Sequence, residues 1–118
     1  MGKTIEKIER VAKMLNGRHM PKAYEVYKHF KGSLYVVITV ARHTETNELF
    51  VIYSDIREMQ RMYARPLEMF MSEVDHEKYP QVKQVYRFTQ VHPEEMEEES
   101  DKVEVPDLTL ELDESMEP

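Results

Sequence analysis

Seven side chains that suit ligand binding lie at the turns and strand ends that the sequence predicts: His29, Lys31, Arg42, His43, Glu45, Tyr53 and Arg65. Arg65 can hold a phosphate or carboxylate group through two parallel hydrogen bonds, while Lys31 and Arg42 add positive charge. Tyr53 or Phe30 offers a ring on which a base can stack. Small β domains often bind through such loops, so these residues predict an anionic ligand.

The same residues also have a structural interpretation. Arg65 can cap a loop or pair with Glu68 or Glu45, and His43-Thr44-Glu45-Thr46 can form hydrogen bonds within its own turn. The aromatic residues Phe30, Tyr35 and Phe70 can belong to the core. The sequence alone leaves both interpretations open.

Catalytic and metal-binding patterns are missing from the sequence. The chain has no cysteine, so it offers neither a thiolate nucleophile nor a thiolate zinc site. His29, His43 and His76 are not spaced as H-x-x-x-H or H-E-x-x-H. With three glycines in all, there is no nucleophile elbow and no phosphate-cradling loop. We therefore expect no enzyme activity, no catalytic residues, no metal and no cofactor.

Charge is divided unevenly along the chain. The net charge is −7, but residues 94–118 hold twelve acidic residues and one basic residue, Lys102, which gives −11. Subtraction from 16 basic and 23 acidic residues leaves 15 basic and 11 acidic residues in 1–93, a surplus of +4. This surplus permits an anionic ligand, but it is smaller than a non-specific nucleic-acid binder needs.

The elements that must position these residues begin with a helix over Thr4–Asn16. Its apolar residues recur at helical spacing and Gly17 lies just past its end. They are Ile5, Ile8, Val11, Ala12 and Leu15. We expect this stripe to pack on the domain rather than to dock on a partner or lie on a membrane surface.

The pattern after this helix is that of short strands. Tyr24, Val26 and His29 alternate with polar residues, and strands are predicted over 34–41, 49–53 and 84–91, with turns at 31–33 and 42–48. Residues 54–64 are expected to be irregular or to form a single helical turn. Pro66 begins a short helix over 67–70 and holds Arg65 extended, beside the His43-Thr44-Glu45 turn. The predicted fold is mainly β, a small SH3-like barrel or a strongly bent antiparallel sheet.

Three regions follow from these patterns. Residues 1–19 form the amphipathic helix, 20–92 the single β domain, and 93–118 an acidic tail expected to be disordered. Within the tail, Val103, Val105, Leu108, Leu110 and Leu112 could add a strand to a sheet edge of this chain or of a partner. The charged N-terminus, the absence of a long apolar run and the lack of cysteine favour a cytoplasmic protein without a membrane partner.

Four ordered blocks between Tyr24 and Val91 carry a family resemblance. The blocks read YKHFKG at 27–32, ARHTET at 41–46, VIY at 51–53 and RPLEMF at 65–70. In order and spacing they resemble the bacterial and phage family numbered 1653 among the domains of unknown function. Members of that family carry a glycine-bearing turn before the Arg-Pro pair, whereas this chain has Ser54–Ala64 there. The resemblance implies a compact β fold and no established chemistry.

Two kinds of function remain open at this point. The first is a non-enzymatic module that binds a nucleotide-like or other small anionic ligand, or RNA. The second is a protein–protein adaptor or inhibitor that uses the acidic tail or the N-terminal helix. A phage-encoded protein that acts on a host nucleic-acid machine would be an example of the second kind.

Overall fold

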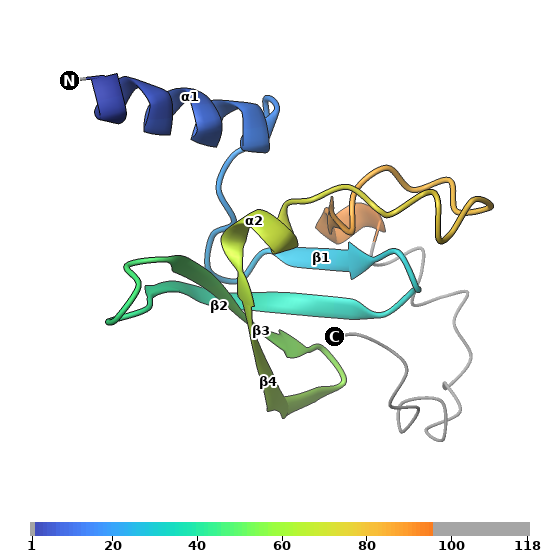
Figure 1. Ribbon diagram of the computed structural model, residues 1–118. Coiled ribbons are helices and arrows are strands. Elements are labelled where there is room, and N and C mark those ends of the chain that lie inside the picture. Colours follow the sequence, from blue (N-terminus) through green and yellow to red (C-terminus); the bar gives the residue numbers. More distant parts are fainter. Residues whose placement is uncertain (1, 96–118) are drawn as a thin grey trace.

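The computed structural model describes residues 2–95 of the 118-residue chain. Its elements are α1 (Gly2–Leu15), β1 (Val26–His29), β2 (Leu34–Arg42), β3 (Leu49–Asp55), β4 (Glu58–Pro66), α2 (Leu67–Phe70) and β5 (Phe88–Val91). The strands form one antiparallel sheet in the order β4-β3-β2-β1-β5 (Figure 1). The predicted mainly β class and the N-terminal helix are confirmed.

The sheet is open, because β4 and β5 are its two edges and do not pair with each other. It is nevertheless strongly bent. In a flat sheet β3 and β5 would lie three strand spacings apart, about 14 Å, yet the ring centroids of Tyr53 on β3 and Phe88 on β5 are 5.4 Å apart. The bent antiparallel sheet, rather than the SH3-like barrel, is therefore the observed architecture.

The start of β1 differs from the predicted alternation of Tyr24, Val26 and His29. Tyr27 and His29 are buried, whereas Val26 is half-buried and Tyr24 is 83% exposed. Tyr24 lies before the strand and has a left-handed backbone with φ of 71°. Because side chains alternate between the two faces of a strand, Tyr27 and His29 share the buried face and Val26 points to the other. The prediction that Tyr24 takes part in the alternation is therefore wrong.

The segment 54–64 is also different from its prediction. β3 continues to Asp55, Ile56 and Arg57 form a turn, and β4 runs back along β3. The Asp55 carboxylate accepts a hydrogen bond of 2.9 Å from the Arg57 backbone N–H and so closes the turn. The apolar spacing that suggested a helical turn belongs to a nine-residue strand. The expectation of an irregular segment is wrong.

A short helix covers one end of the inner face of the sheet. As predicted, α2 follows Pro66 directly, and Leu67 and Phe70 are its buried residues. The Phe70 ring stacks on Phe88 with 4.2 Å between centroids and also meets Tyr27 and Tyr53 edge-on. This aromatic contact joins α2 to strands at the middle and at the edge of the sheet.

Helix α1 extends away from the sheet (Figure 1). Ile5, Ile8 and Val11 are 54%, 62% and 39% exposed, while Met14 and Leu15 at the end of the helix pack against the core. The expectation that the apolar stripe packs on the domain is therefore wrong for most of the helix. The linker after Leu15 holds the helix away from the sheet, a geometry that the helical spacing does not specify.

The C-terminal end of α1 is anchored by one arginine. Arg18 donates hydrogen bonds of 2.8 Å to the carbonyl oxygens of Leu15, Met14 and Met71. Its guanidinium carbon lies 3.6 Å from the centroid of the Tyr86 ring. The first two bonds satisfy carbonyls at the helix end and the third reaches the domain, so α1 leaves the domain in a defined direction.

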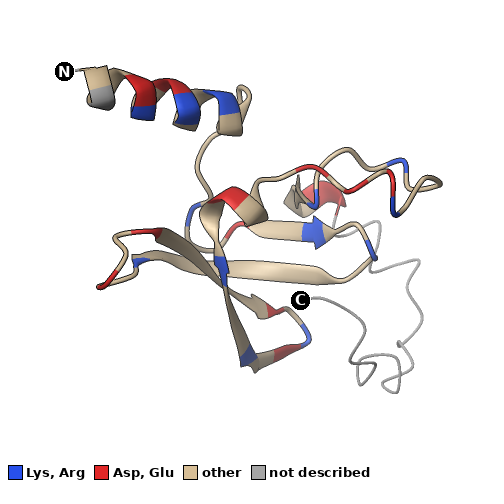
Figure 2. Ribbon diagram, viewed as in Figure 1, with Lys and Arg blue, Asp and Glu red and all other residues tan. Residues whose placement is uncertain are grey.

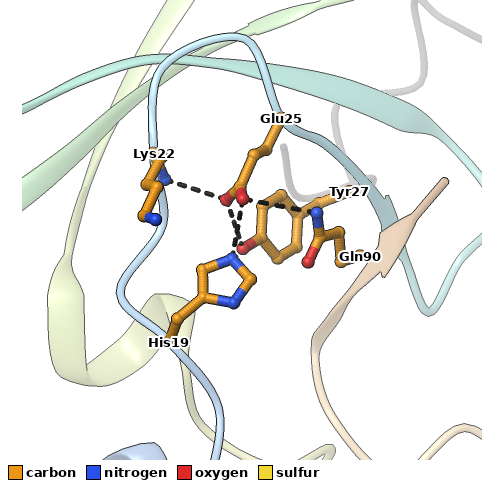
Figure 3. A network of polar contacts seen from close by, with 5 residues as sticks. All are labelled: His19, Lys22, Glu25, Tyr27 and Gln90. Carbon is orange, nitrogen blue, oxygen red and sulfur yellow. Dashed lines mark hydrogen bonds and ion pairs between the residues drawn. The ribbon is translucent and has the colours of Figure 1, made fainter. Parts of the chain in front are cut away.

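The linker between α1 and β1 is fastened by the Glu25 carboxylate (Figure 3). It accepts hydrogen bonds from the His19 ring at 2.7 Å, the Lys22 backbone N–H at 2.9 Å, the Tyr27 hydroxyl at 3.1 Å and the Gln90 amide at 3.3 Å. Burial alone would raise the pKa of Glu25, but these hydrogen bonds and the charge of His19 lower it below its usual value. The linker is thereby tied to both β1 and β5.

The predicted tail begins inside the described residues and continues beyond them. Residues 93–95 form a helical turn, and the predictions of disorder and of an added strand at 103–112 fall outside the described residues. Within residues 2–95, no helix is long and apolar enough to cross a membrane.

Candidate functional site

One buried side chain from each strand meets on the inner face of the bent sheet. These five residues, called the inner-face cluster below, are His29 (β1), Tyr35 (β2), Tyr53 (β3), Arg65 (β4) and Phe88 (β5). His29 and Tyr53 lie 4.9 and 5.4 Å from Phe88 between ring centroids. Tyr35 lies 5.4 Å from Tyr53. Sheet curvature brings the five residues together, because they span the full width of the sheet.

Arg65 is the cation of this cluster. It is 9% exposed, and its Nε–H donates a hydrogen bond of 3.1 Å to the Tyr53 hydroxyl oxygen. Its guanidinium carbon lies 5.6 Å from the Phe88 ring centroid. Arg65 stands opposite Val51 in the β3–β4 ladder. Its side chain was expected beside the His43-Thr44-Glu45 turn, but it points across the inner face instead.

His29 is completely buried, and its ring is fixed by the turn that follows β1. The Lys31 backbone N–H donates a hydrogen bond of 3.1 Å to His29 Nδ1. The His29 backbone N–H donates to the Ser33 carbonyl oxygen at 2.8 Å. The Gly32 backbone N–H donates to the His29 carbonyl oxygen, also at 2.8 Å. Gly32 has φ of 112°, which a residue with a side chain rarely adopts. The local sequence therefore determines which way the ring faces.

The protonation state of His29 follows from these contacts. Burial, together with the positive charges of Arg65, Arg87 and Lys31, lowers the pKa of His29 to about 3. The ring is neutral at pH 7, and since Nδ1 accepts a hydrogen bond, the proton lies on Nε2. Nε2 is buried and has no hydrogen-bond partner among the described residues. A buried donor without an acceptor lowers the free energy of unfolding by roughly 1–3 kcal/mol. A hydrogen-bond acceptor at Nε2 would therefore stabilise the site.

The charges that act on His29 are positive, whereas the buried Asp55 carboxylate acts on Tyr35 at the other side of the cluster. Every charged group that shifts the His29 pKa is a cation. Burial raises the pKa of the Tyr53 hydroxyl, and Arg65 and Arg87 act against this rise. Lys31 lies near the rings of Phe30 and Tyr79, with Nζ 5.9 and 5.7 Å from their centroids. An acceptor that meets His29 Nε2 would therefore be favoured if it carried negative charge.

Arg42, His43 and Glu45 are not part of this cluster. They lie on the β2–β3 hairpin, at the opposite end of β2 from the turn that holds Lys31, and the hairpin carries acidic residues (Figure 2). Arg42 donates to the Asn47 carbonyl oxygen at 3.1 Å. His43 Nδ1 accepts from the backbone N–H groups of Glu45 and Thr46 at 3.1 and 3.2 Å. These contacts close the hairpin, as in the structural interpretation of the sequence.

The structure therefore joins four of the seven predicted residues, His29, Lys31, Tyr53 and Arg65, around one buried site. It adds Arg87, Tyr35 and Phe88, and the last two belong to the hydrophobic core, as the structural interpretation expected of Tyr35. Tyr35 was interpreted as a possible core aromatic, and Phe88 as part of a closing strand. The alternation within each strand identifies which residues point inward. It does not show that Tyr35 on β2 and Phe88 on β5 lie next to each other on the inner face.

Within residues 2–95, no three His, Asp or Glu side chains are grouped so that they could hold a metal ion. The inner-face cluster contains no carboxylate, and its one imidazole already uses Nδ1 as an acceptor. Its chemistry is that of hydrogen-bond donors and positive charge.

Comparison with known proteins places the cluster within a family domain. A family model described as "Protein of unknown function (DUF1653)" matches residues 25–90, which contain all five cluster residues and exclude α1 and the acidic tail. No curated protein and no solved structure matched the chain. The family model covers more than half of the sequence, with the blocks at 27–32 and 65–70 supplying His29 and Arg65. The chain belongs to the DUF1653 family.

Proposed function

We propose that this protein is a non-enzymatic binding module that takes a small anionic ligand on the inner face of its sheet. The observation that carries the proposal is the buried Nε2–H of His29, which has no acceptor among the described residues and lies in a field of cations. An anionic oxygen would supply the acceptor and offset the positive charge. This ligand class agrees with the one predicted from the residue types.

A hydrogen-bond donor, a guanidinium group and two aromatic rings would contact the ligand. His29 Nε2–H donates one hydrogen bond, and Arg65 presents a guanidinium whose direction is set by its bond to the Tyr53 hydroxyl. The Phe88 and Tyr35 rings lie 6.0 Å apart between centroids on the same inner face and would contact the planar part of a nucleotide-like ligand once the face opens. Because His29 is fully buried, ligand entry requires the side chains that cover it to move.

A single buried water molecule is the simplest competing occupant of such a site. A water would satisfy Nε2–H without any preference for negative charge. The two occupants therefore differ in one measurable way, because only an anionic ligand should bind with an affinity that depends on the Arg65 guanidinium. A test must compare Arg65 with an equally charged residue elsewhere in the chain.

The experiment is an NMR titration of the full-length chain with inorganic phosphate, adenosine monophosphate and a short RNA. We expect phosphate or the nucleotide to shift the His29 Nε2–H and Arg65 Nε–H signals. Arg65→Lys keeps the charge but loses the paired hydrogen bonds, so it should weaken binding by roughly 1–3 kcal/mol. The matched control is Arg42→Lys on the β2–β3 hairpin, which should bind as the wild type does.

The titration has outcomes that reject the proposal. If phosphate and the nucleotide leave both signals unchanged, or if Arg42→Lys weakens binding as much as Arg65→Lys does, the inner face is not the binding site. If Arg65→Lys lowers the unfolding temperature markedly while binding stays normal, Arg65 is a structural residue. Binding of RNA alone would assign the surface to a nucleic acid rather than to a small molecule.

A second candidate function is supported by α1. Its apolar stripe of Ile5, Ile8 and Val11 is exposed, while Arg18 fixes the direction of the helix. Such a face suits a hydrophobic groove on a partner protein, as expected of an adaptor. The test is photo-crosslinking from position 8 in the producing cell, followed by reconstitution with the purified partner. Ile8→Glu should abolish reconstituted binding, and unchanged binding would reject this candidate.

A further inference from the structure

We infer that the acidic segment after Glu95 is an internal competitor for the inner-face cluster and lowers the affinity of the site for outside anions. The inference rests on the proposed function, since it concerns the regulation of the same site. It commits to one occupant, residues 96–118 of this chain. These residues lie outside the described part of the structure, so the case depends on their sequence and on the surface that they can reach.

Charge complementarity is the first support. Residues 96–118 contain ten acidic residues and one lysine, which gives a formal charge of −9. The cations Arg65, Arg87 and Lys31 act together on His29, without an acidic side chain among the groups that shift its pKa. Helix α1, the other basic element, mixes its cations with Glu6 and Glu9. The cations beside His29, on the side of the cluster away from the Asp55 carboxylate, therefore attract a polyanionic segment.

Hydrogen-bond chemistry is the second support. The His29 Nε2–H needs an acceptor, and every carboxylate of the acidic segment is an acceptor that carries negative charge. A carboxylate would fill the same position as the phosphate or carboxylate group of an outside ligand. The segment and the ligand would thus compete for one site rather than bind side by side.

The tether is the third support. Phe88 on β5 stands opposite His29 on β1, and β5 ends three residues later at Val91. Residue 96 follows Phe88 by eight positions, which span at most about 29 Å even in a fully extended chain, so the acidic segment starts within reach of the cluster. Its 23 residues can extend up to about 3.3–3.6 Å each, which is ample for contact. Linkage of this kind gives local concentrations in the millimolar range.

The first experiment locates the segment in the full-length chain. Because the protein has no cysteine, Ser115→Cys provides a unique position for a nitroxide spin label. At about 20 mM salt we expect the label to broaden the NMR signals of Lys31, Arg65 and Phe88, and at about 500 mM salt the broadening should largely disappear. The β2–β3 hairpin, which carries Glu45 and Glu48, should stay sharp at both salt concentrations.

The second experiment measures the competition. A full-length variant in which every Asp and Glu after Glu95 is replaced by Asn or Gln keeps the tether and removes the charge. It should bind inorganic phosphate at least about threefold more tightly than the wild type at low salt, since a tethered competitor at millimolar local concentration is lost. At high salt the two chains should bind phosphate equally well.

The outcomes separate this inference from the proposed function. If the labelled chain shows broadening on α1 or evenly over the surface, or if both chains bind phosphate and the charge-free variant binds it no better than the wild type does, the competition is rejected. If neither chain binds any anion but the label still broadens Arg65 and Phe88, the proposed function fails and docking of the segment stands. If phosphate binds the cluster while no broadening occurs, only the inference fails.

Discussion

His29 and His43 show how differently one residue type behaves in the two turns of this sheet. Both rings accept backbone N–H groups at Nδ1, so both organise the turn in which they lie. His43 is exposed on its hairpin, whereas His29 is buried among Phe30, Tyr35 and Phe88. Burial therefore makes His29 a neutral hydrogen-bond donor at the inner face.

The stability of the domain should fall in weak acid because of His29. Its pKa in the folded chain is about 3, against an ordinary value of 6.5, so the unfolded chain binds a proton first as the pH falls. The contribution of the neutral His29 ring to the free energy of unfolding is fully present above about pH 6.5 and is lost progressively as the pH falls below that value. From about pH 7 to about pH 5 the loss should be about 2 kcal/mol, measured by urea unfolding.

His29→Gln and His43→Gln test the assignment of this pH dependence. His29→Gln should remove most of the loss between about pH 7 and about pH 5, because glutamine does not titrate. His43→Gln is the matched control and should keep the wild-type dependence. Equal slopes for the wild type and His29→Gln would show that the pKa of His29 is the same in the folded and unfolded chains, which would contradict the assignment.

Tyr53 should contribute to stability through its hydroxyl group. Tyr53→Phe removes the acceptor of the Arg65 Nε–H bond inside the cluster, and hydrogen bonds to charged groups contribute roughly 1.5–3 kcal/mol. We expect a decrease in the free energy of unfolding in that range. Tyr24→Phe is the control, because Tyr24 is 83% exposed, and it should change the free energy of unfolding by less than about 0.5 kcal/mol. A decrease of equal size in both variants would contradict the special role of Tyr53.

At the scale of elements, α1 behaves differently from the rest of the fold. The two ends of α1 differ in burial. Met14 and Leu15 at the C-terminal end pack on the core, while Ile5, Ile8 and Val11 stay exposed. An isolated helix of 14 residues is only marginally stable in water. The Arg18 contacts at its C-terminal end therefore matter for the helix as well as for its direction.

Ile8→Ala should leave the stability of the domain nearly unchanged. Ile8 is 62% exposed, and alanine has the higher helix propensity, so the free energy of unfolding should change by less than about 0.5 kcal/mol. Leu67→Ala is the comparison within α2, where the side chain is buried, and it should cost about 2–5 kcal/mol. Thermal or urea unfolding measures both variants. A large loss in Ile8→Ala would mean that the stripe packs on the domain.

At the scale of the whole molecule, Glu25 connects parts of the chain that are distant in sequence. Its carboxylate joins the α1–β1 linker at His19 to Gln90 on the last strand (Figure 3). The sheet edge at β5 is thereby held to the chain segment that enters the domain. Loss of this carboxylate should loosen the linker and β5 together.

Glu25→Gln should lower the free energy of unfolding at pH 7 by roughly 1–2 kcal/mol, since it weakens several hydrogen bonds to a charged acceptor. The Glu25 pKa is lowered in the folded chain, so its contribution is present above its ordinary value of 4.5 and is lost as the pH falls further. The difference between the wild type and Glu25→Gln should therefore shrink in acid. Glu48→Gln, on the exposed hairpin, serves as the control, and a difference that grows in acid would refute the assignment.

The sequence by itself determined the features that depend on neighbouring residues. The helical spacing of Ile5, Ile8 and Leu15 predicted α1, and Pro66 predicted the start of α2. The polar run 42–48 predicted a hairpin, and the run 31–33 predicted the turn at Gly32. The resemblance predicted the family, and the family model matches residues 25–90, which include His29 and Arg65. All of these signals act within a few positions of the chain.

Only the tertiary structure decided the features that depend on pairing across the sheet. The spacing of Ile56, Met59 and Met62 suits a helical turn, and pairing with β3 made the segment a strand instead. The meeting of His29, Arg65 and Phe88 required the sheet to bend, because these residues lie on β1 and on the two edge strands. Long-range pairing and curvature arise from the packing of the whole domain, so local spacing does not encode them.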